Sequence, residues 1–392
     1  MSLVPIHACF LPLVDACVLI VAKEMGFARD EGLDLHLVRE KSWANVRDRL
    51  SLGHFDAAHM LVPMPIAAKL IVSPIALDVV APMVLGAGGN AVTVSRALAD
   101  QMRDHLNDDE AARFDPTAQG QALAKALAAR KRKGLPSAVF GVVHPYSAHN
   151  YDLRYWLAAN GISPQRDVEF LIIPPPLMPQ AIESGTIDGF CVGEPWSSVV
   201  CARGLGQIIT TKAQIWPNSP EKVLGVTERF LNKNEGAVQA LLRALMNAAF
   251  WCKDGAHATD LADILSASQY LDVPADHILP SLNGTFTGMN GSTVTVPNFF
   301  LPGGPTIHRP DVAHGLWYYS QMVRWGHVPN NKENLAAVMS RFRTDVFDAA
   351  LAGSHAVAAS PATSTALFDD VPFHPDDLFG YVDHLLKFDQ IA

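Results

Sequence analysis

The chain has 392 residues, of which 49% are hydrophobic and 18% charged, and its formal net charge at pH 7 is -9. This composition is that of a globular protein and excludes a disordered or fibrous chain. With this negative net charge, we expect no basic surface that could bind nucleic acid. The single basic run, residues 130–133, is explained by the cationic last turn of a predicted helix. The length allows one large core or, as we expect, two lobes.

The first part of the chain alternates predicted strands and helices. Strands are predicted at residues 5–10, 33–38 and 55–60. Helices are predicted from a cap at Asp15 to about residue 26, over residues 43–53 behind a Ser42 N-cap, and over residues 66–72 after two prolines. This alternation predicts an α/β lobe.

A glycine-rich turn at residues 86–90 separates two predicted strands, residues 79–85 and 91–94. Glycines permit backbone torsions that a Cβ would forbid, so we interpret this turn as a crossover between lobes. The competing interpretation is a phosphate-binding loop, but the GxGxxG and Walker spacings are absent.

Residues 170–196 give the clearest local pattern in the middle of the chain. An apolar strand ends at three prolines, a short helix runs to Gly185, and a second apolar run ends at the loop 193–196, Gly-Glu-Pro-Trp. Two strands joined through a helix predict a parallel βαβ unit, whose ligands collect at the carboxyl ends of the strands. We therefore expect this loop to be a hinge or a pocket wall.

The five cysteines are odd in number and lack Cys-x-x-Cys or zinc-ligand spacing, so we expect reduced thiols and no metal or cofactor. Residues 8–22 are apolar, but Asp15 interrupts them and no Lys or Arg precedes them, which argues against a signal peptide. No uncharged apolar run of 18 residues predicts a membrane span. The expected location is the cytoplasm.

Five segments together resemble the substrate-binding proteins of nitrate and bicarbonate ABC importers, the NrtA/CmpA-like family, and most closely their soluble regulatory relatives of NasS type. The segments are KSWANVRDRL (41–50), FDAAHMLVPMP (55–65), HNYDLRYWLAANGI (149–162), FCVGEPW (190–196) and IWPNSPEKVLGV (215–226). The similarity covers about residues 5–231 and is loose beyond them.

The resemblance implies an α/β fold of the type II periplasmic-binding-protein kind, with two lobes, a ligand cleft and two crossover strands. We expect lobe 1 to comprise residues 1–85, lobe 2 residues 86–196, and residues 197–392 to complete lobe 1 and add a C-terminal helical region.

The resemblance also implies an anion site. Carried over by position, the ligand-binding residues are Trp43, Gly89, Asn90, His149 and Lys222, where Asn90 replaces a longer glutamine of the family. The physics agrees, because a planar monoanion needs donors in its plane and a buried cation. Without the family motifs, each residue has a simpler interpretation. Trp43 would be a packing residue, His149 a capping or surface histidine, and Lys222 an exposed lysine.

His59 lies near a predicted strand end, and the sequence leaves it open between pocket and core. Glu194 is interpreted as a structural residue of the hinge. No GxSxG, HExxH or other catalytic spacing occurs, so no enzyme is predicted.

By resemblance, the expected function is a cytoplasmic sensor of nitrate or nitrite that sequesters a NasT-like RNA-binding antiterminator and releases it when the anion binds. The protein itself would contact neither nucleic acid nor membrane. The first alternative is the substrate-binding protein of an importer for nitrate, bicarbonate or another oxyanion. A pyrimidine-biosynthesis enzyme is a third, but its cysteine-rich loop is absent.

Overall fold

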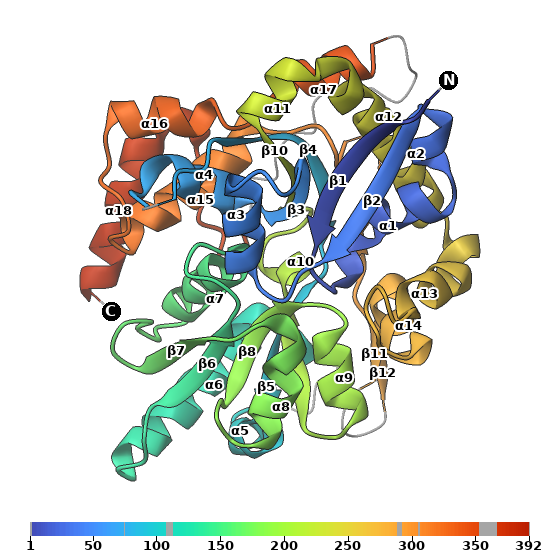
Figure 1. Ribbon diagram of the computed structural model, residues 1–392. Helices are drawn as coiled ribbons and strands as arrows, with labels where there is room; N and C mark the ends of the chain where they lie inside the picture. Colours follow the sequence, from blue (N-terminus) through green and yellow to red (C-terminus); the bar gives the residue numbers. More distant parts are fainter. Residues whose placement is uncertain are drawn as a thin grey trace.

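The protein folds into two α/β lobes, each built around its own sheet, as the ribbon shows (Figure 1). The computed structural model describes residues 2–73, 75–106, 113–287, 292–304, 306–352 and 367–391. The predicted alternation of strands and helices is present in both lobes.

The upper sheet in Figure 1 has the strand order β13-β4-β10-β3-β1-β2. Its strands are β1 (Val4–Phe10), β2 (Leu33–Arg39), β3 (Ala57–Leu61), β4 (Val79–Gly88), β10 (Pro220–Thr227) and β13 (Phe300–Leu301). The strands β1, β2 and β3 pair in parallel, whereas β10 runs antiparallel between β3 and β4. Both β3 and β4 are buried along their whole length, as expected for strands covered on both faces.

The lower sheet has the order β7-β6-β8-β5-β9. Its strands are β5 (Asn90–Ser95), β6 (Ala138–Val142), β7 (Val168–Ile172), β8 (Gly189–Gly193) and β9 (Gly206–Thr211). The strands β7 and β8 both run parallel to β6, which lies between them. The βαβ unit predicted from residues 170–196 is thus present, with β6 inserted between its two strands.

Helices surround both sheets (Figure 1). In the first half of the chain they are α1 (Cys17–Glu24), α2 (Phe27–Asp30), α3 (Trp43–Ser51), α4 (Pro63–Leu70), α5 (Arg96–Arg103), α6 (Pro116–Arg132), α7 (Ala148–Ala159), α8 (Met178–Glu183) and α9 (Trp196–Ala202). In the second half they are α10 (Lys212–Ile215), α11 (Glu228–Lys233), α12 (Glu235–Lys253), α13 (Ala258–Ser266), α14 (Ala275–Asn283), α15 (Val312–Arg324), α16 (Lys332–Met339), α17 (Thr344–Ala350) and α18 (Leu378–Ile391). A short hairpin, β11 (Thr285–Thr287) and β12 (Thr293–Thr295), follows α14.

The chain passes from the upper to the lower sheet at Gly89, inside the predicted glycine turn. Gly88 has φ +71, and a Cβ there would lie 2.2 Å from the carbonyl oxygen of Phe299. Both the torsion and the close approach require glycine. The turn is therefore fixed by local backbone chemistry that the sequence shows directly.

The chain returns to the upper sheet between β9 and β10, by way of α10. The predicted return at residue 197 is wrong, because β9 pairs antiparallel with β5 and so belongs to the lower sheet. The prediction followed the continuity of the chain, whereas membership of a sheet is decided by hydrogen-bond pairing between distant segments.

Each lobe has a buried apolar core. The lower core contains Val92, Phe140 and Trp156, and a larger cluster fills the upper lobe and continues across the junction. None of the helices in the described ranges is long and apolar enough to cross a membrane.

Candidate functional site: a buried charged cluster between the lobes

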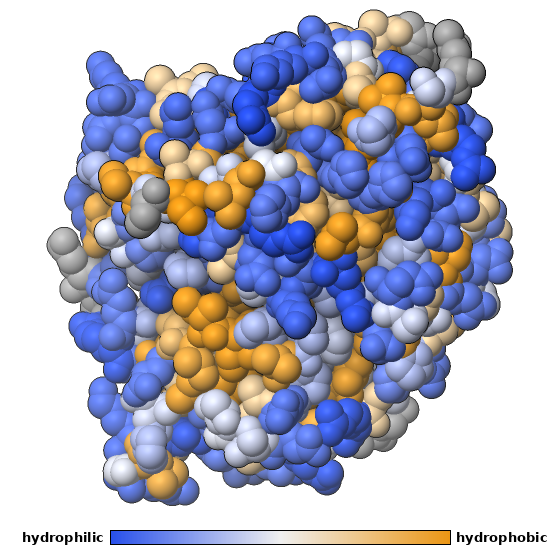
Figure 2. Space-filling view, viewed as in Figure 1, coloured by the Kyte–Doolittle hydropathy of each residue, from blue (hydrophilic) through white to orange (hydrophobic). Residues whose placement is uncertain are grey.

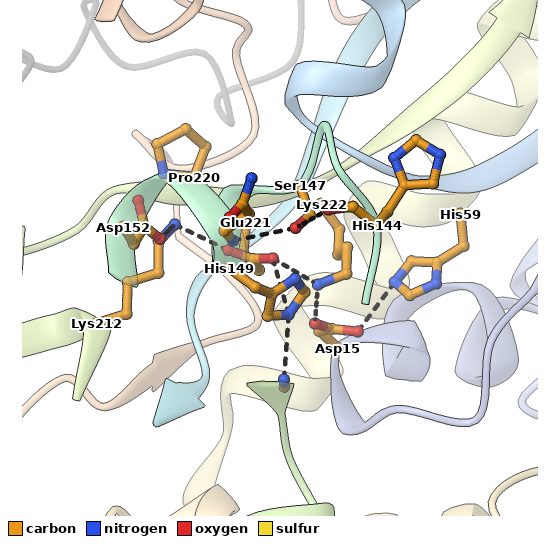
Figure 3. Close-up of polar contacts among 12 residues, drawn as sticks. Asp15, His59, His144, Ser147, His149, Asp152, Lys212, Pro220, Glu221 and Lys222 are labelled. Atoms are coloured by element: carbon orange, nitrogen blue, oxygen red, sulfur yellow. Dashed lines mark hydrogen bonds and ion pairs between the residues drawn. The ribbon is translucent and has the colours of Figure 1, made fainter. Parts of the chain in front are cut away.

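A cluster of charged and polar side chains lies between the two sheets (Figure 3). It draws from the loop after β1, from β3 and from β10 in the upper lobe, and from α7 in the lower lobe. The site thus lies where parallel strands end, as ligand sites of open α/β sheets do. The charged members are Asp15, Asp152, Lys212, Glu221 and Lys222, and each is at most 3% exposed.

Lys212, at the start of α10, holds one end of the cluster. Its Nζ donates to Asp152 Oδ2 at 2.7 Å, to Glu221 Oε2 at 2.8 Å and to the hydroxyl of Tyr318 at 2.8 Å. The three N–H groups of the ammonium are therefore satisfied by three partners. Because Asp152 belongs to the lower lobe and Glu221 to the upper one, this lysine ties the lobes together.

Lys222 holds the other end. Its Nζ donates to Glu221 Oε1 at 2.8 Å and forms an ion pair with Asp15 Oδ2 at 2.7 Å. The second oxygen of Asp15 lies 3.0 Å from His59 Nε2. The predicted buried cation is present, but two carboxylates already balance its charge.

His149 lies in the first turn of α7, which Ser147 caps by accepting from Asn150 N–H. The backbone N–H of Gly193, at the end of β8, donates to His149 Nε2 at 3.1 Å. In a neutral imidazole the proton must then lie on Nδ1. Nδ1 is buried and has no hydrogen-bond partner among the described residues, so it presents a free N–H.

Opposite charges keep the two carboxylates next to Lys222 ionised. Burial by itself would raise the pKa of Asp15, but the Lys222 ammonium and His59 outweigh it, and this pKa lies well below its usual range. Burial likewise opposes the ionisation of Glu221, yet Lys212 and Lys222 lower its pKa to about 2.

Burial dominates at the remaining groups. It raises the pKa of Asp152 to about 6 despite the nearby Lys212, and it lowers the pKa of His149 to about 3. It also lowers the pKa of His59. At neutral pH the cluster therefore consists of carboxylates, ammonium groups and neutral imidazoles.

Two further predicted residues border this cluster. Trp43 begins α3 behind the Ser42 cap, and its ring lies 5.6 Å from Lys222 Nζ. A Cβ built on Gly193 would meet Asn90 Oδ1 at 3.2 Å and Asp15 Oδ2 at 3.3 Å, which places Asn90 beside the ion pairs. Trp43 Nε1 and the side-chain amide of Asn90 are fully buried and have no hydrogen-bond partner in the part of the chain that the structure describes.

Gly89 departs from the expected arrangement. Its backbone N–H donates to the carbonyl oxygen of Phe299 at 2.7 Å. That N–H is therefore not available to a ligand in this conformation. At this turn the free donor is the side chain of Asn90.

His59 is fully buried, and its ring centroid lies 5.5 Å from that of Trp43. His59 Nε2 contacts Asp15, so His59 is a buried member of the cluster, and its contact with a ligand stays a prediction. Glu194 remains structural, because its carboxylate accepts from Ser198 N–H and its carbonyl accepts from Val14 N–H of the other lobe.

Sequence reasoning missed four members of the cluster, Asp15, Asp152, Lys212 and Glu221. Asp15 was expected to cap a helix, but α1 begins at Cys17 without a side-chain cap and Asp15 faces Lys222 instead. Asp152 lies three residues after His149 and so shares its helix face, a signal that could have been used.

Glu221 and Lys222 are neighbours on a strand and would ordinarily face opposite sides of the sheet. Here the register of β10 against β4 shifts on both sides of Lys222, and the two residues join one network. An irregularity of this kind is invisible in the sequence.

Comparisons with known proteins show what the whole chain is similar to. The profile of the NMT1-like family matches residues 3–266. The nitrate/nitrite binding protein NrtA of Synechococcus elongatus is 31% identical over 392 residues, covering 96% of this chain and 85% of NrtA. The bicarbonate transport ATP-binding protein CmpC of the same species is 34% identical over 384 residues, covering 96% of this chain. This chain spans only 54% of CmpC.

Solved structures show the same fold. The periplasmic nitrate-binding protein NrtA from Synechocystis PCC 6803 superposes with a TM-score of 0.88 at 26% identity, covering 98% of both chains. A ligand-binding component of an ABC-type import system from Staphylococcus aureus, with a TM-score of 0.64 at 16% identity, shares the fold over 88% of this chain and 99% of its own. The predicted α/β periplasmic-binding-protein fold is confirmed.

The structural role of Lys212 can be tested by measuring the free energy of unfolding of a variant. Lys212→Met removes the ammonium and leaves Asp152 and Glu221 buried without it, which should cost about 3–5 kcal/mol of unfolding free energy. Urea denaturation measures the loss. Lys131→Met is the matched control, because that side chain is 81% exposed and its contact with Asp167 is 3.6 Å long. Equal stability of the two variants would contradict a structural role for Lys212.

Proposed function

The chain belongs to the NMT1-like family, and we propose that the cluster between its lobes binds nitrate or nitrite. The observation that carries the proposal is a group of neutral donors without partners around one buried lysine. They are Trp43 Nε1, His149 Nδ1 and the amide of Asn90. A buried donor without an acceptor is costly, so a ligand that accepts from all of them gains free energy on binding.

The charges favour a monoanion. Lys222 is already balanced by Asp15 and Glu221, so a divalent anion would add two negative charges to a buried site without a free cation. Nitrate and nitrite carry one charge and only accept hydrogen bonds. Neutral N–H donors suit such ions, and the low pKa of His149 keeps its imidazole neutral.

The relatives support the same ligand class. Synechococcus NrtA is named a nitrate/nitrite binding protein, and the solved NrtA structure is that of a nitrate-binding protein. Bicarbonate is the second candidate, because CmpC, a bicarbonate transport protein, matches over 96% of this chain.

We propose further that the anion is a signal in the cytoplasm, read by a NasT-like antiterminator. A fully buried ion cannot touch a partner, so it acts by favouring one arrangement of the lobes. Exposed apolar side chains occur on both lobes, among them Val72 and Ile75 above and Leu171, Ile172 and Leu177 below. Figure 2 shows apolar patches on both the upper and the lower part of one face, which suits a partner that spans the lobes.

The relatives support a second role equally. In that role the protein would be the substrate-binding protein of an importer for nitrate, bicarbonate or another oxyanion. A permease would also contact both lobes. The two roles differ in the partner, not in the anion site.

Removal of one donor tests the site. Trp43→Phe keeps the ring and deletes only the indole N–H, so we expect nitrate affinity to fall about 5- to 15-fold, as for loss of one hydrogen bond of roughly 1–1.5 kcal/mol. Isothermal titration calorimetry measures the affinity. Trp251→Phe, on α12, is the control and should bind as the parent does. Unchanged affinity in Trp43→Phe would remove Trp43 from the site.

Affinity should depend on pH. At neutral pH, three carboxylates face two ammonium groups in the cluster, and a bound monoanion adds a further negative charge. Burial raises the pKa of Asp152 to about 6, and the charges of Lys212, Glu221 and Lys222 also act on it. The anion raises this pKa further, so above pH 6 binding takes up a proton.

The sign follows from that linkage. Nitrate should bind most tightly below pH 6, and its Kd should rise by up to about tenfold per pH unit above it, until the pKa of the bound state is passed. Calorimetry in buffers of different ionisation enthalpy counts the protons. Asp152→Asn should bind with little pH dependence. A parent Kd that is constant from pH 5.5 to 8.5 would refute the linkage.

The sensor role predicts reciprocal coupling. Nitrate should weaken the antiterminator complex by roughly 5- to 150-fold, and the antiterminator should weaken nitrate by the same factor. The two proteins are co-purified without nitrate and titrated with it, with chloride as the control ion. The importer role is favoured if nitrate does not change the stability of the complex, or if the two proteins form no complex.

A further inference from the structure

The strand β7 forms one edge of the lower sheet (Figure 1). It pairs in parallel with β6 on one side, and no strand in the described ranges pairs with its other side. Ile173, directly after β7, donates its N–H to the carbonyl oxygen of Val142 in β6. Because successive residues of a strand alternate in direction, the backbone groups of Phe170 and Ile172 point away from β6. This outer edge therefore offers backbone donors and acceptors to a further strand.

The carboxyl end of the same strand carries exposed apolar side chains. Leu171 is 40% exposed and Ile172 is 54% exposed. Neighbouring residues of a strand face opposite sides of the sheet, so both faces of β7 are open at this end. Leu177, shortly after the strand, is 49% exposed, and Figure 2 shows an apolar patch on the lower lobe. An apolar surface therefore continues from the edge of the sheet into the following turn.

The other edges of the two sheets are protected against pairing. The edge strand β2 exposes the polar side chains of Asp34, His36 and Arg39. The opposite edge of the lower sheet, β9, is buried along most of its length, and β13 has only two residues. Charged side chains, cover and short length are the means by which proteins prevent edge-to-edge association. The strand β7 has five residues and a single charge, Glu169, so this edge is open by comparison.

The amino end of β7 is positively charged. Lys131 is 81% exposed, and its Nζ lies 3.6 Å from Asp167, the residue before the strand. Residues 131–133 at the end of α6 are all basic and exposed, and so is Arg166. These four cations outnumber the nearby carboxylates of Asp167 and Glu169, although the whole chain has a net charge of -9. Cations suit the end of α6, but the helix does not account for the open apolar strand beside them.

We propose that β7 binds an extended segment of another protein, which adds an antiparallel strand to the lower sheet. The segment carries apolar residues opposite Leu171 and Ile172, and acidic residues at its carboxyl end, beside Lys131 and Arg166. A second copy of this chain fits worse, because twofold antiparallel pairing of β7 would place the cations of each copy beside the apolar end of the other. The surface lies on one lobe and rests on neither the nitrate site nor the antiterminator.

Peptide binding tests this edge directly and without nitrate. The probes are two fluorescein-labelled, amidated peptides, TVTVTDEE and TVTVTKRR, which share a strand-forming half and differ in the charge of the carboxyl end. Each is titrated with the full chain, and fluorescence anisotropy measures binding. We expect a Kd of about 10–100 μM for TVTVTDEE and an affinity at least about tenfold lower for TVTVTKRR.

Two variants at one position separate the backbone from the side chain. Ile172→Pro deletes an outward N–H, and proline is tolerated on an edge strand whose N–H faces solvent. Ile172→Thr makes the side chain polar and keeps that N–H. Because main-chain hydrogen bonds carry the affinity in strand addition, we expect TVTVTDEE to bind at least about tenfold more weakly to Ile172→Pro, and less than about threefold more weakly to Ile172→Thr. Thermal unfolding checks that each variant is folded.

Charge reversal gives a second test that leaves the strand unaltered. Lys131→Glu combined with Arg166→Glu should weaken the binding of TVTVTDEE and strengthen that of TVTVTKRR. The proposal is overturned if TVTVTDEE does not bind, if it binds no better than TVTVTKRR, or if it binds folded Ile172→Pro as tightly as the parent. It is also overturned if sedimentation velocity shows a dimer that Ile172→Pro separates, since a second copy then covers the edge. Failure of nitrate to bind would count against the proposed function alone.

Discussion

The two lobes depend on one row of buried charges of alternating sign. Asp152, Lys212, Glu221, Lys222 and Asp15 follow one another at 2.7–2.8 Å, and the row begins in the lower lobe and ends in the upper one. Desolvation of each ion costs several kcal/mol, and only a partner on each side offsets it. Separation of the lobes breaks the row at Asp152, so the charges couple the arrangement of the lobes to the state of the site.

The same row limits what the site can hold. Its lysines are already paired with carboxylates, and the groups left without partners include the neutral N–H donors of Trp43, His149 and Asn90. Neutral donors offer a buried anion directed hydrogen bonds, and their positions are fixed by packing before the ligand arrives. His149 shows how this is achieved: one ring nitrogen accepts from Gly193, which directs the proton to the other. A monoanion would add one negative charge, which protonation of Asp152 offsets, whereas a divalent anion would add two.

The contacts that hold the loop 193–196 join it to segments far away in the sequence, and they explain its composition. A Cβ on Gly193 would lie within 3.3 Å of both Asn90 Oδ1 and Asp15 Oδ2, so a side chain there would have to displace them. Glu194 and Trp196 hold the upper lobe through Val14 and through the carbonyl of Pro12. This loop is therefore both a wall of the site and part of the connection between the lobes.

The sequence determined the local elements. The Ser42 cap, the glycine turn at the first crossover and the βαβ pattern before Trp196 follow from short-range chemistry, and each is present in the structure. The family motifs identified Trp43, Asn90, His149 and Lys222, which the fold brings together around one cluster.

Only the tertiary structure decided the rest. The return of the chain after β9 rests on pairing with β5, and the roles of Asp15, Asp152, Lys212 and Glu221 rest on contacts between segments far apart in the sequence. Strand pairing and ion pairing depend on which groups come into contact in the folded protein. The irregular register of β10 places Glu221 and Lys222 in one network. Local propensity contains no information about these long-range contacts, because their energies depend on partners and burial that exist only in the folded chain.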